Sequence, residues 1–308
     1  MEFGIQTRGD WNFVLATTRW AEDRDHIAAV ALPDHYLQRG DDLEKPAWDH
    51  LVHLAALAAE SSSIDLVAMV SPVTFRHPAV LYKMAVTIDE ISGGRFTLGL
   101  GAGWLEEEFT LFGLPFPDLG TRMGLLEEAM AYLRAAITPD AVGFKGDHYQ
   151  LAEFDPRPHP VRLRLLAGGA GGPRARRITA LYADEYNLYA TTPAKYSEVV
   201  QATRDLAREN GRDPDEVSWS SAGPGVAAVK EIDYRRMLDG IAELTGTSPE
   251  HIETRWEERG YPHGSGSKAA EMIAALEAAG CQRFYAQVFA AGDDPSEFDL
   301  VFEALIGR

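Results

Sequence analysis

The chain has 308 residues, 45% of them hydrophobic, which is enough for a large core and near the usual length of one (β/α)8 barrel. Its formal net charge of -18 disfavours nucleic acid and anionic membranes as partners, because both are bound by basic surfaces. The sequence has no apolar run of about 18 residues and no charged-then-apolar leader, so we expect no membrane span, no signal peptide and a cytoplasmic location. The single cysteine, Cys281, excludes an intramolecular disulfide and a thiolate metal cluster within one chain.

Strand-like and helix-like segments alternate along the whole chain. Apolar runs and period-two alternation predict eight strands, at Glu2–Thr7, Ile27–Leu32, Ile64–Val70, Phe96–Gly101, Leu163–Ala167, Glu185–Tyr189, Val217–Ala222 and Arg283–Phe289. Helical periodicity predicts helices between them, among others at Trp11–Arg24, Trp48–Glu60, Arg122–Ile137, Pro173–Tyr182, Pro193–Asn210, Lys268–Ala279 and Phe298–Ile306. Right-handed crossovers would wind such strands into a barrel or an open sheet, and the count and length favour an α/β (β/α)8 TIM barrel.

Two polar stretches interrupt this alternation. One lies at about 138–160 and is rich in proline and aromatic residues, with turn-like character around Phe144–Tyr149. The other lies at about 225–265, where Asp233–Glu258 has helical character. We interpret both as insertions, so that residues 1–308 form a single domain.

The stretch from Arg76 to Trp104 contains a helix and a strand with clear boundaries. The helix begins near Pro78 and stops at Gly93-Gly94, and the strand Phe96–Gly101 alternates bulky residues with threonine and glycine. One face of this strand is nearly bare, which predicts room for a ligand. The segment Gly101-Ala102-Gly103 at its end would let a flat molecule approach the backbone closely.

A glycine-rich turn follows the fifth predicted strand. Gly168, Gly169, Ala170 and Gly171 can turn their N–H groups toward an anion, and Pro173 starts a helix whose N-terminus favours phosphate. Arginines at positions 174, 176 and 177 suggest negative charge to be neutralised, or else they face outward on the surface. The spacing matches neither the dinucleotide-binding GxGxxG motif nor a P-loop.

Polar residues follow the second predicted strand, at what would be the active end of a barrel. Asp34 and His35 there could orient and transfer a proton, or they could belong to a capped loop with a solvated histidine. Arg76 reads most simply as a salt-bridge partner at the barrel rim. A metal site is not expected, although His50 and His53 are one helical turn apart, because barrel helices are peripheral. Of the acidic trio Glu106-Glu107-Glu108, at most one side chain can face inward.

These residues carry a family resemblance that covers nearly the whole chain. The segment VAMVSPVTFRHPAVLYKMAVTIDEISGGRFTLGLGAGW, with Leu166–Gly172, Ala183–Asn187 and the closing AALEAAGCQRFYAQVF, resembles the bacterial luciferase-like superfamily, particularly its deazaflavin (coenzyme F420)-dependent oxidoreductases. The resemblance implies a TIM barrel with insertions, usually a homodimer, with an isoalloxazine-like ring across the C-terminal mouth. It also implies that Asp34 and His35 lie beside the ring, that a bulge with a non-prolyl cis peptide near Met69-Val70 backs it, and that Gly168–Gly171 hold the phosphate.

The resemblance therefore predicts an F420-dependent oxidoreductase that moves hydride between the cofactor and a small organic substrate. His35 would donate or accept the proton, Glu108 would support it, and Arg174 with its neighbouring arginines would receive the anionic tail of F420. Sugar-phosphate dehydrogenases of this family have a glutamate where Trp104 stands here, so oxidation of a sugar phosphate is not expected. The alternatives are an FMN-dependent monooxygenase and, further away, a phosphate-binding TIM-barrel lyase or a non-catalytic flavoprotein.

Overall fold

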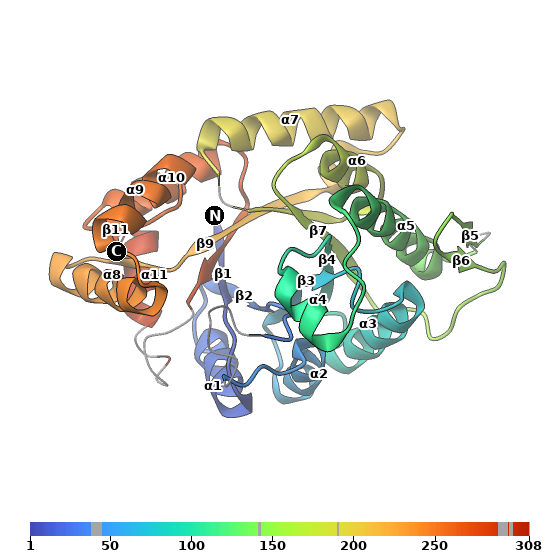
Figure 1. The fold of residues 1–308 in the computed structure, drawn as a ribbon, viewed down its shortest axis with the longest axis horizontal. Helices are drawn as coiled ribbons and strands as arrows, with labels where there is room; N and C mark the ends of the chain where they lie inside the picture. Colours follow the sequence, from blue (N-terminus) through green and yellow to red (C-terminus); the bar gives the residue numbers. More distant parts are fainter. Residues whose placement is uncertain (38–44, 141–142, 190, 289–294, 296–297, 308) are drawn as a thin grey trace.

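Eight parallel strands close into a barrel (Figure 1). The computed structural model describes residues 1–37, 45–140, 143–189, 191–288, 295 and 298–307. In barrel order, with the last strand pairing with the first, the strands are β1 (Glu2–Gln6), β2 (Ile27–Leu32), β3 (Asp65–Pro72), β4 (Phe96–Gly101), β7 (Arg164–Gly169), β8 (Glu185–Tyr189), β9 (Ser218–Pro224) and β12 (Arg283–Gln287). The predicted barrel is confirmed. Phe289, the predicted end of the last strand, lies outside the described residues.

Helices follow the strands along the chain, and most of them surround the barrel (Figure 1). They are α1 (Trp11–Glu22), α2 (His50–Glu60), α3 (Pro78–Ser92), α4 (Glu106–Phe112), α5 (Leu119–Ile137), α6 (Pro173–Tyr182), α7 (Pro193–Glu209), α8 (Glu231–Thr245), α9 (Pro249–Arg259), α10 (Lys268–Ala278) and α11 (Phe298–Ile306). The main core lies between the outward strand faces and these helices, where Ile5, Leu98 and Phe302 are fully buried. No helix among the described residues is long and apolar enough to span a membrane.

The interior of the barrel has its own smaller core, because alternate strand residues point inward. Its members are mostly small or aliphatic: Ala29, Ala31, Val67, Met69, Leu166, Ala222 and Tyr285, with Val70 packed against them. Gly4 makes room for the Tyr285 ring, since a Cβ at Gly4 would lie 2.5 Å from Cδ1 of that ring. These side chains therefore fill the part of the barrel interior that they line.

The bare face of β4 is filled by protein. A Cβ added at Gly101 would lie 2.7 Å from Cγ2 of Val70, and one at Gly99 would lie 2.3 Å from the carbonyl oxygen of Ala68 and 3.0 Å from Cγ1 of Val70. Gly168 on β7 faces the same side chain, at 2.8 Å. The prediction that this face leaves room for a ligand is wrong, because the glycines make room for Val70 instead.

The two insertions carry short elements. In the first, β5 (Phe144–Lys145) pairs antiparallel with β6 (Gln150–Leu151), and residues 141–142 lie outside the described part of the chain. In the second, α8 and α9 accompany the pair formed by β10 (Ala227–Ala228) and β11 (Gly264–Ser265).

The helical character predicted for Asp233–Glu258 is confirmed, and the stretch divides into two helices because the chain turns between α8 and α9. Gly246 adopts a left-handed φ of 61° at the end of α8. Ser248 then caps α9 by accepting a hydrogen bond from the backbone N–H of His251, with Pro249 as the first helical residue.

Arginines cap helix C-termini at the end of the barrel opposite the mouth. Arg95 donates to the carbonyls of Ala58 and Ser61 at the end of α2, at 3.2 and 2.9 Å. Arg134 donates to the carbonyl of Tyr182 at the end of α6, at 2.6 Å. These contacts satisfy carbonyls that have no partner within their helix and place positive charge at the negative ends of the helix dipoles.

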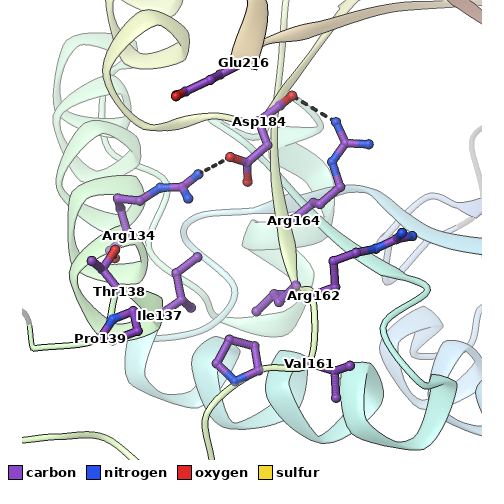
Figure 2. A pocket seen from close by; sticks show the side chains of 11 residues that line it. Arg134, Ile137, Thr138, Pro139, Val161, Arg162, Arg164, Asp184 and Glu216 are labelled. Atoms are coloured by element: carbon purple, nitrogen blue, oxygen red, sulfur yellow. Dashed lines mark hydrogen bonds and ion pairs between the residues drawn. The ribbon is translucent and has the colours of Figure 1, made fainter. Parts of the chain in front are cut away.

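A cavity of about 520 Å³ opens at this same end, beside the starts of β7, β8 and β9. Figure 2 shows Arg134 and Arg164 pointing toward Asp184 from opposite sides. Arg134 reaches the Asp184 carboxylate at 2.7 Å, and Arg164 donates to its backbone carbonyl at 3.0 Å. Arg162 and Glu216 also line the cavity. These groups cap helices and form hydrogen bonds at the N-terminal ends of the barrel strands, the end that serves stability in such barrels. We therefore assign them a structural role.

Candidate functional site at the barrel mouth

A buried glutamate holds the imidazole of His35 just beyond β2. Nδ1 of His35 lies 3.1 Å from Oε1 of Glu108, whose side chain on α4 is fully buried. The other oxygen of Glu108 accepts the backbone N–H of Tyr36 at 3.0 Å. With Nδ1 donating to the carboxylate, Nε2 becomes the ring nitrogen that can exchange a proton with a ligand. The structure thus brings His35 and Glu108 together, and Glu108 is the inward-facing member of its acidic trio.

Asp34, the neighbour of His35, belongs to a buried polar network. Its Oδ2 accepts hydrogen bonds from the hydroxyl of Ser71 and from NH1 of Arg76, both at 2.5 Å. NH2 of Arg76 also donates to Asp49 at 2.5 Å, and Asp49 caps the start of α2. Although burial lowers the pKa of Arg76, the carboxylates of Asp34 and Asp49 raise it above its ordinary value.

Aromatic side chains line the mouth beside His35. The Trp104 ring packs edge-on against the His35 ring with centroids 5.7 Å apart, and 58% of Trp104 is exposed. Tyr36 stacks on Phe75, with centroids 4.1 Å apart and planes 7° apart. Phe112 on α4 packs against Tyr36 at 5.3 Å. An exposed indole next to an imidazole suits a substrate that has an apolar surface.

The floor of the mouth contains the expected non-prolyl cis peptide, between Met69 and Val70. The Met69 carbonyl accepts a hydrogen bond from Nε2 of Gln6 at 2.7 Å, and Gln6 in turn accepts one from Nε2 of Gln287 at 2.7 Å. Tyr189 donates to Gln287 at 3.4 Å. These hydrogen bonds link β8, β12, β1 and β3, and they have no local signal in the sequence because they depend on which strands are neighbours in the barrel.

The glycine-rich turn after β7 leads directly into α6. Gly171 has a φ of 79°, and its N–H donates to the hydroxyl of Tyr186 at 3.0 Å. Gly172 is the N-cap of α6, and no side chain caps the first turn of this helix. Nε of Arg176 is buried and has no hydrogen-bond partner among the described residues. Open backbone N–H groups at the start of a helix fit an anion such as phosphate, and Arg176 adds positive charge one turn further along α6, where, after the larger effect of Lys195, it also lowers the pKa of Glu198 on α7.

The other two arginines of α6 are engaged by α5. Arg174 donates to the Gly120 carbonyl at 2.8 Å and lies 3.8 Å from Glu127. Arg177 forms an ion pair with the same Glu127. Both guanidinium groups remain about half-exposed, but part of their charge is already neutralised.

The remaining predicted site residues lie at the end of β4. Gly101 packs against Val70, as described, and Ala102 is partly buried against the main core. Gly103 has a φ of 77°, and a Cβ there would lie 3.2 Å from the Phe109 ring. These residues share the mouth with His35 and the glycine-rich turn, because all of them follow the C-terminal ends of strands.

Two buried histidines lie at the start of α2, close to the mouth. Neither ring nitrogen of His50, nor Nδ1 of His53, has a hydrogen-bond partner among the described residues. Burial lowers the pKa of His50 to about 3, with smaller contributions from His53 and His35, so its ring is neutral near pH 7. The described residues contain no group of three or more histidine, cysteine or acidic side chains placed to hold a metal ion. Cys281 is buried just before β12, at the far end of the barrel.

Comparison with known families and sequences adds to this geometry. The profile of the luciferase-like monooxygenase family matches residues 4–297. The pyrimidine monooxygenase RutA of Bradyrhizobium sp. strain BTAi1 is 31% identical over 186 residues, which cover 57% of this chain and 51% of the relative. RutA of Methylorubrum populi is 34% identical over 178 residues, covering 54% and 46%. The matched stretch spans about half the length of these curated relatives.

Solved structures share the fold at low sequence identity. An F420-dependent secondary alcohol dehydrogenase, in complex with an F420–acetone adduct, superimposes with a TM-score of 0.81 at 18% identity, over 100% of this chain and 99% of that one. Monooxygenase RslO1 from Streptomyces bottropensis gives a TM-score of 0.79 at 22% identity, over 99% of both chains. At such identities these likenesses establish the architecture alone.

Proposed function

Because the chain belongs to the luciferase-like monooxygenase family, we propose that it is an FMN-dependent monooxygenase acting on a small organic substrate. The observation that carries this proposal is the anion cradle at the start of α6, formed by the uncapped helix end that follows the glycine-rich turn, with Arg176 one helical turn further along. This cradle suits a single phosphate group. The proposal reverses the order of the cofactors predicted from sequence, where F420 came first and FMN second.

The arginines of α6 are the reason for preferring FMN. The tail of F420 carries several carboxylates besides its phosphate, and it would need free cations beyond the cradle. Arg174 and Arg177, the residues expected to supply them, already contact α5 and its Glu127. FMN has only its phosphate, so Arg176 and the backbone of α6 suffice.

Residues of the mouth would then orient the ring and handle protons. The Val70 side chain and the floor held by Gln6 give the ring an apolar support with a fixed carbonyl beside it. Reduced FMN supplies the electrons for oxygen chemistry when it is bound. His35, fixed through Nδ1 by Glu108, presents Nε2 for proton exchange with the substrate.

F420-dependent oxidation or reduction is the second candidate. About half of the Arg174 and Arg177 side chains is still exposed to solvent, so a polycarboxylate tail could compete for them with Glu127. A phosphate-binding lyase and a non-catalytic flavoprotein remain further alternatives.

The test is oxygen incorporation. The protein is supplied with FMN, a flavin reductase, NADH and ¹⁸O₂, and pyrimidines are the first candidate substrates because the relatives in sequence are pyrimidine monooxygenases. We expect product that carries one ¹⁸O atom, and at least about tenfold less product from His35→Asn. Product formation that needs F420 and proceeds without oxygen would refute the proposal.

We also propose a homodimer. Val52 on α2 and Val80 and Ile91 on α3 are each 47–60% exposed on two helices that pack side by side. We expect these exposed apolar side chains to pack against a second copy of the chain. Light scattering should give twice the mass of the 33.8 kDa chain, and Val52→Asp together with Val80→Asp should give the monomer mass.

A further inference from the structure

Arg76 lies at a junction that links both neighbours of His35 to the start of α2. NH1 donates to Asp34 and NH2 to Asp49, each at 2.5 Å. The guanidinium also lies over the Tyr36 ring, with Cζ 5.7 Å from the ring centroid. One side chain thus contacts the residue before His35, the residue after it and the N-cap of α2.

The contacts of Arg76 differ from an ordinary salt bridge at the barrel rim because they are buried. The Arg76 side chain is 8% exposed and Asp34 is 1% exposed, so solvent does little to screen their interaction. The Ser71 hydroxyl donates to the same oxygen of Asp34 and completes its shell. Burial by itself raises the pKa of the Asp34 carboxyl, and the contacts with Arg76 and Ser71 oppose that rise.

The contacts on His35 itself complete the arrangement. Glu108 holds the imidazole and the backbone N–H of Tyr36, while Phe75 stacks on the Tyr36 ring. Residues 34–36 are therefore held from one side by α4 and from the other by the loop after β3. Without the contacts from the loop after β3, the His35 ring would be free to turn away from Glu108.

We propose that Arg76 is a positioning residue for His35, which fixes the imidazole through Asp34 and Tyr36 and ties it to α2 through Asp49. The role of His35 in turnover rests on the proposed function above, but its positioning by Arg76 does not. The planar fork of arginine is needed, because its two terminal nitrogens reach two different carboxylates, and a lysine ammonium is one point charge on a different stem.

The test measures the tautomer of the His35 imidazole directly. Long-range ¹H–¹⁵N NMR of the labelled protein without cofactor shows which ring nitrogen of each of the nine histidines carries the proton, and His35→Asn assigns the His35 signals. We expect a single Nδ1–H tautomer in the wild type and a mixture of tautomers in Arg76→Met and Arg76→Lys. At saturating FMN, turnover of both variants should fall at least about tenfold, with the Kd for FMN changed less than about threefold.

Arg95→Met is the matched control, because Arg95 also makes several partly buried hydrogen bonds but lies at the opposite end of the barrel. It should leave the His35 tautomer and turnover of the folded protein unchanged. If Arg76→Met does not fold, Arg76→Lys alone decides the matter. A wild-type His35 tautomer in the folded Arg76 variants overturns the proposal. Normal turnover of His35→Asn would instead overturn the proposed role of His35 and leave the NMR comparison valid.

Discussion

The side chain of Val70 occupies the space that a Cβ at Gly168 would need, since that Cβ would come within 2.8 Å of Cγ1 of Val70. Gly101 on the neighbouring strand has the same relationship with Cγ2, at 2.7 Å. The glycines of β4 and β7 and the valine of β3 therefore form one packed unit at the floor of the mouth. If the mouth holds a cofactor ring as proposed, the Val70 side chain would limit how deep that ring can lie.

Gly168→Ala should destabilise the protein by about 1–3 kcal/mol, because the added methyl group overpacks against Val70. Val70→Ala combined with Gly168→Ala should recover part of this loss, since the valine branch that clashes is gone. Urea unfolding measures both. Gly240→Ala, where a Cβ meets nothing within 4 Å, is the control and should leave stability unchanged or slightly higher. If the losses of unfolding free energy from Gly168→Ala and Val70→Ala simply add in the double variant, the two residues do not pack directly against each other.

Acid should destabilise the protein partly through His50. Its pKa is lowered from about 6.5 in the unfolded chain to about 3 by burial, so the unfolded state binds the proton between these values. Stability therefore falls as the pH drops below about 6.5, by about 1 kcal/mol between pH 6 and pH 5 for this one group. Denaturant unfolding of His50→Leu should show a pH slope smaller by that amount. An unchanged slope would mean that His50 is not buried neutral.

Arg95→Met should cost about 2–3 kcal/mol of stability, because carbonyls at the end of α2 lose a charged donor. Thermal and urea unfolding measure the loss. FMN affinity of the folded variant should stay within about twofold of the wild type, since Arg95 lies far from the mouth. A large loss of affinity would contradict the separation between a stability end and a binding end of the barrel.

Arg176→Met should weaken FMN binding about tenfold, because the start of α6 loses the positive charge of this guanidinium. Arg177→Met, one position further along α6, is the matched control: its ion pair with Glu127 faces α5, so FMN affinity should change little. Fluorescence quenching of FMN gives both constants. Equal losses in the two variants would indicate general electrostatic attraction instead of a specific phosphate contact.

Local patterns in the sequence predicted the elements well and the contacts between them poorly. The strand Phe96–Gly101 and the helix Pro173–Tyr182 have the predicted boundaries, because alternation, proline and glycine mark them within a few residues. The glycines of β4 gave no sign of what faces them, since Val70 comes from another strand. The contacts of Arg76 with Asp34 and Asp49 join residues 42 and 27 positions apart, which only the closed barrel brings together.

Some residues of the candidate site were predicted from the sequence and others were not. His35, Glu108 and the turn at Gly168–Gly171 were named from their types and from the family resemblance. Gln6 and Gln287 were missed, because an amide on a strand has no sequence signal until its neighbours in the barrel are known. The engagement of Arg177 by Glu127 also needed the packing of α5 on α6.

FMN, and not F420, is the cofactor proposed for the anion cradle of α6. Calorimetric titration of the protein, freed of any bound cofactor, with FMN and with F420 side by side measures this preference. We predict that FMN binds with a Kd of about 1 µM or tighter, equivalent to about -8 kcal/mol, and that F420 binds at least about tenfold more weakly. F420 binding tighter than FMN, with an affinity that falls steeply as salt is added, would contradict the claim and assign the arginines of α6 to the tail of F420.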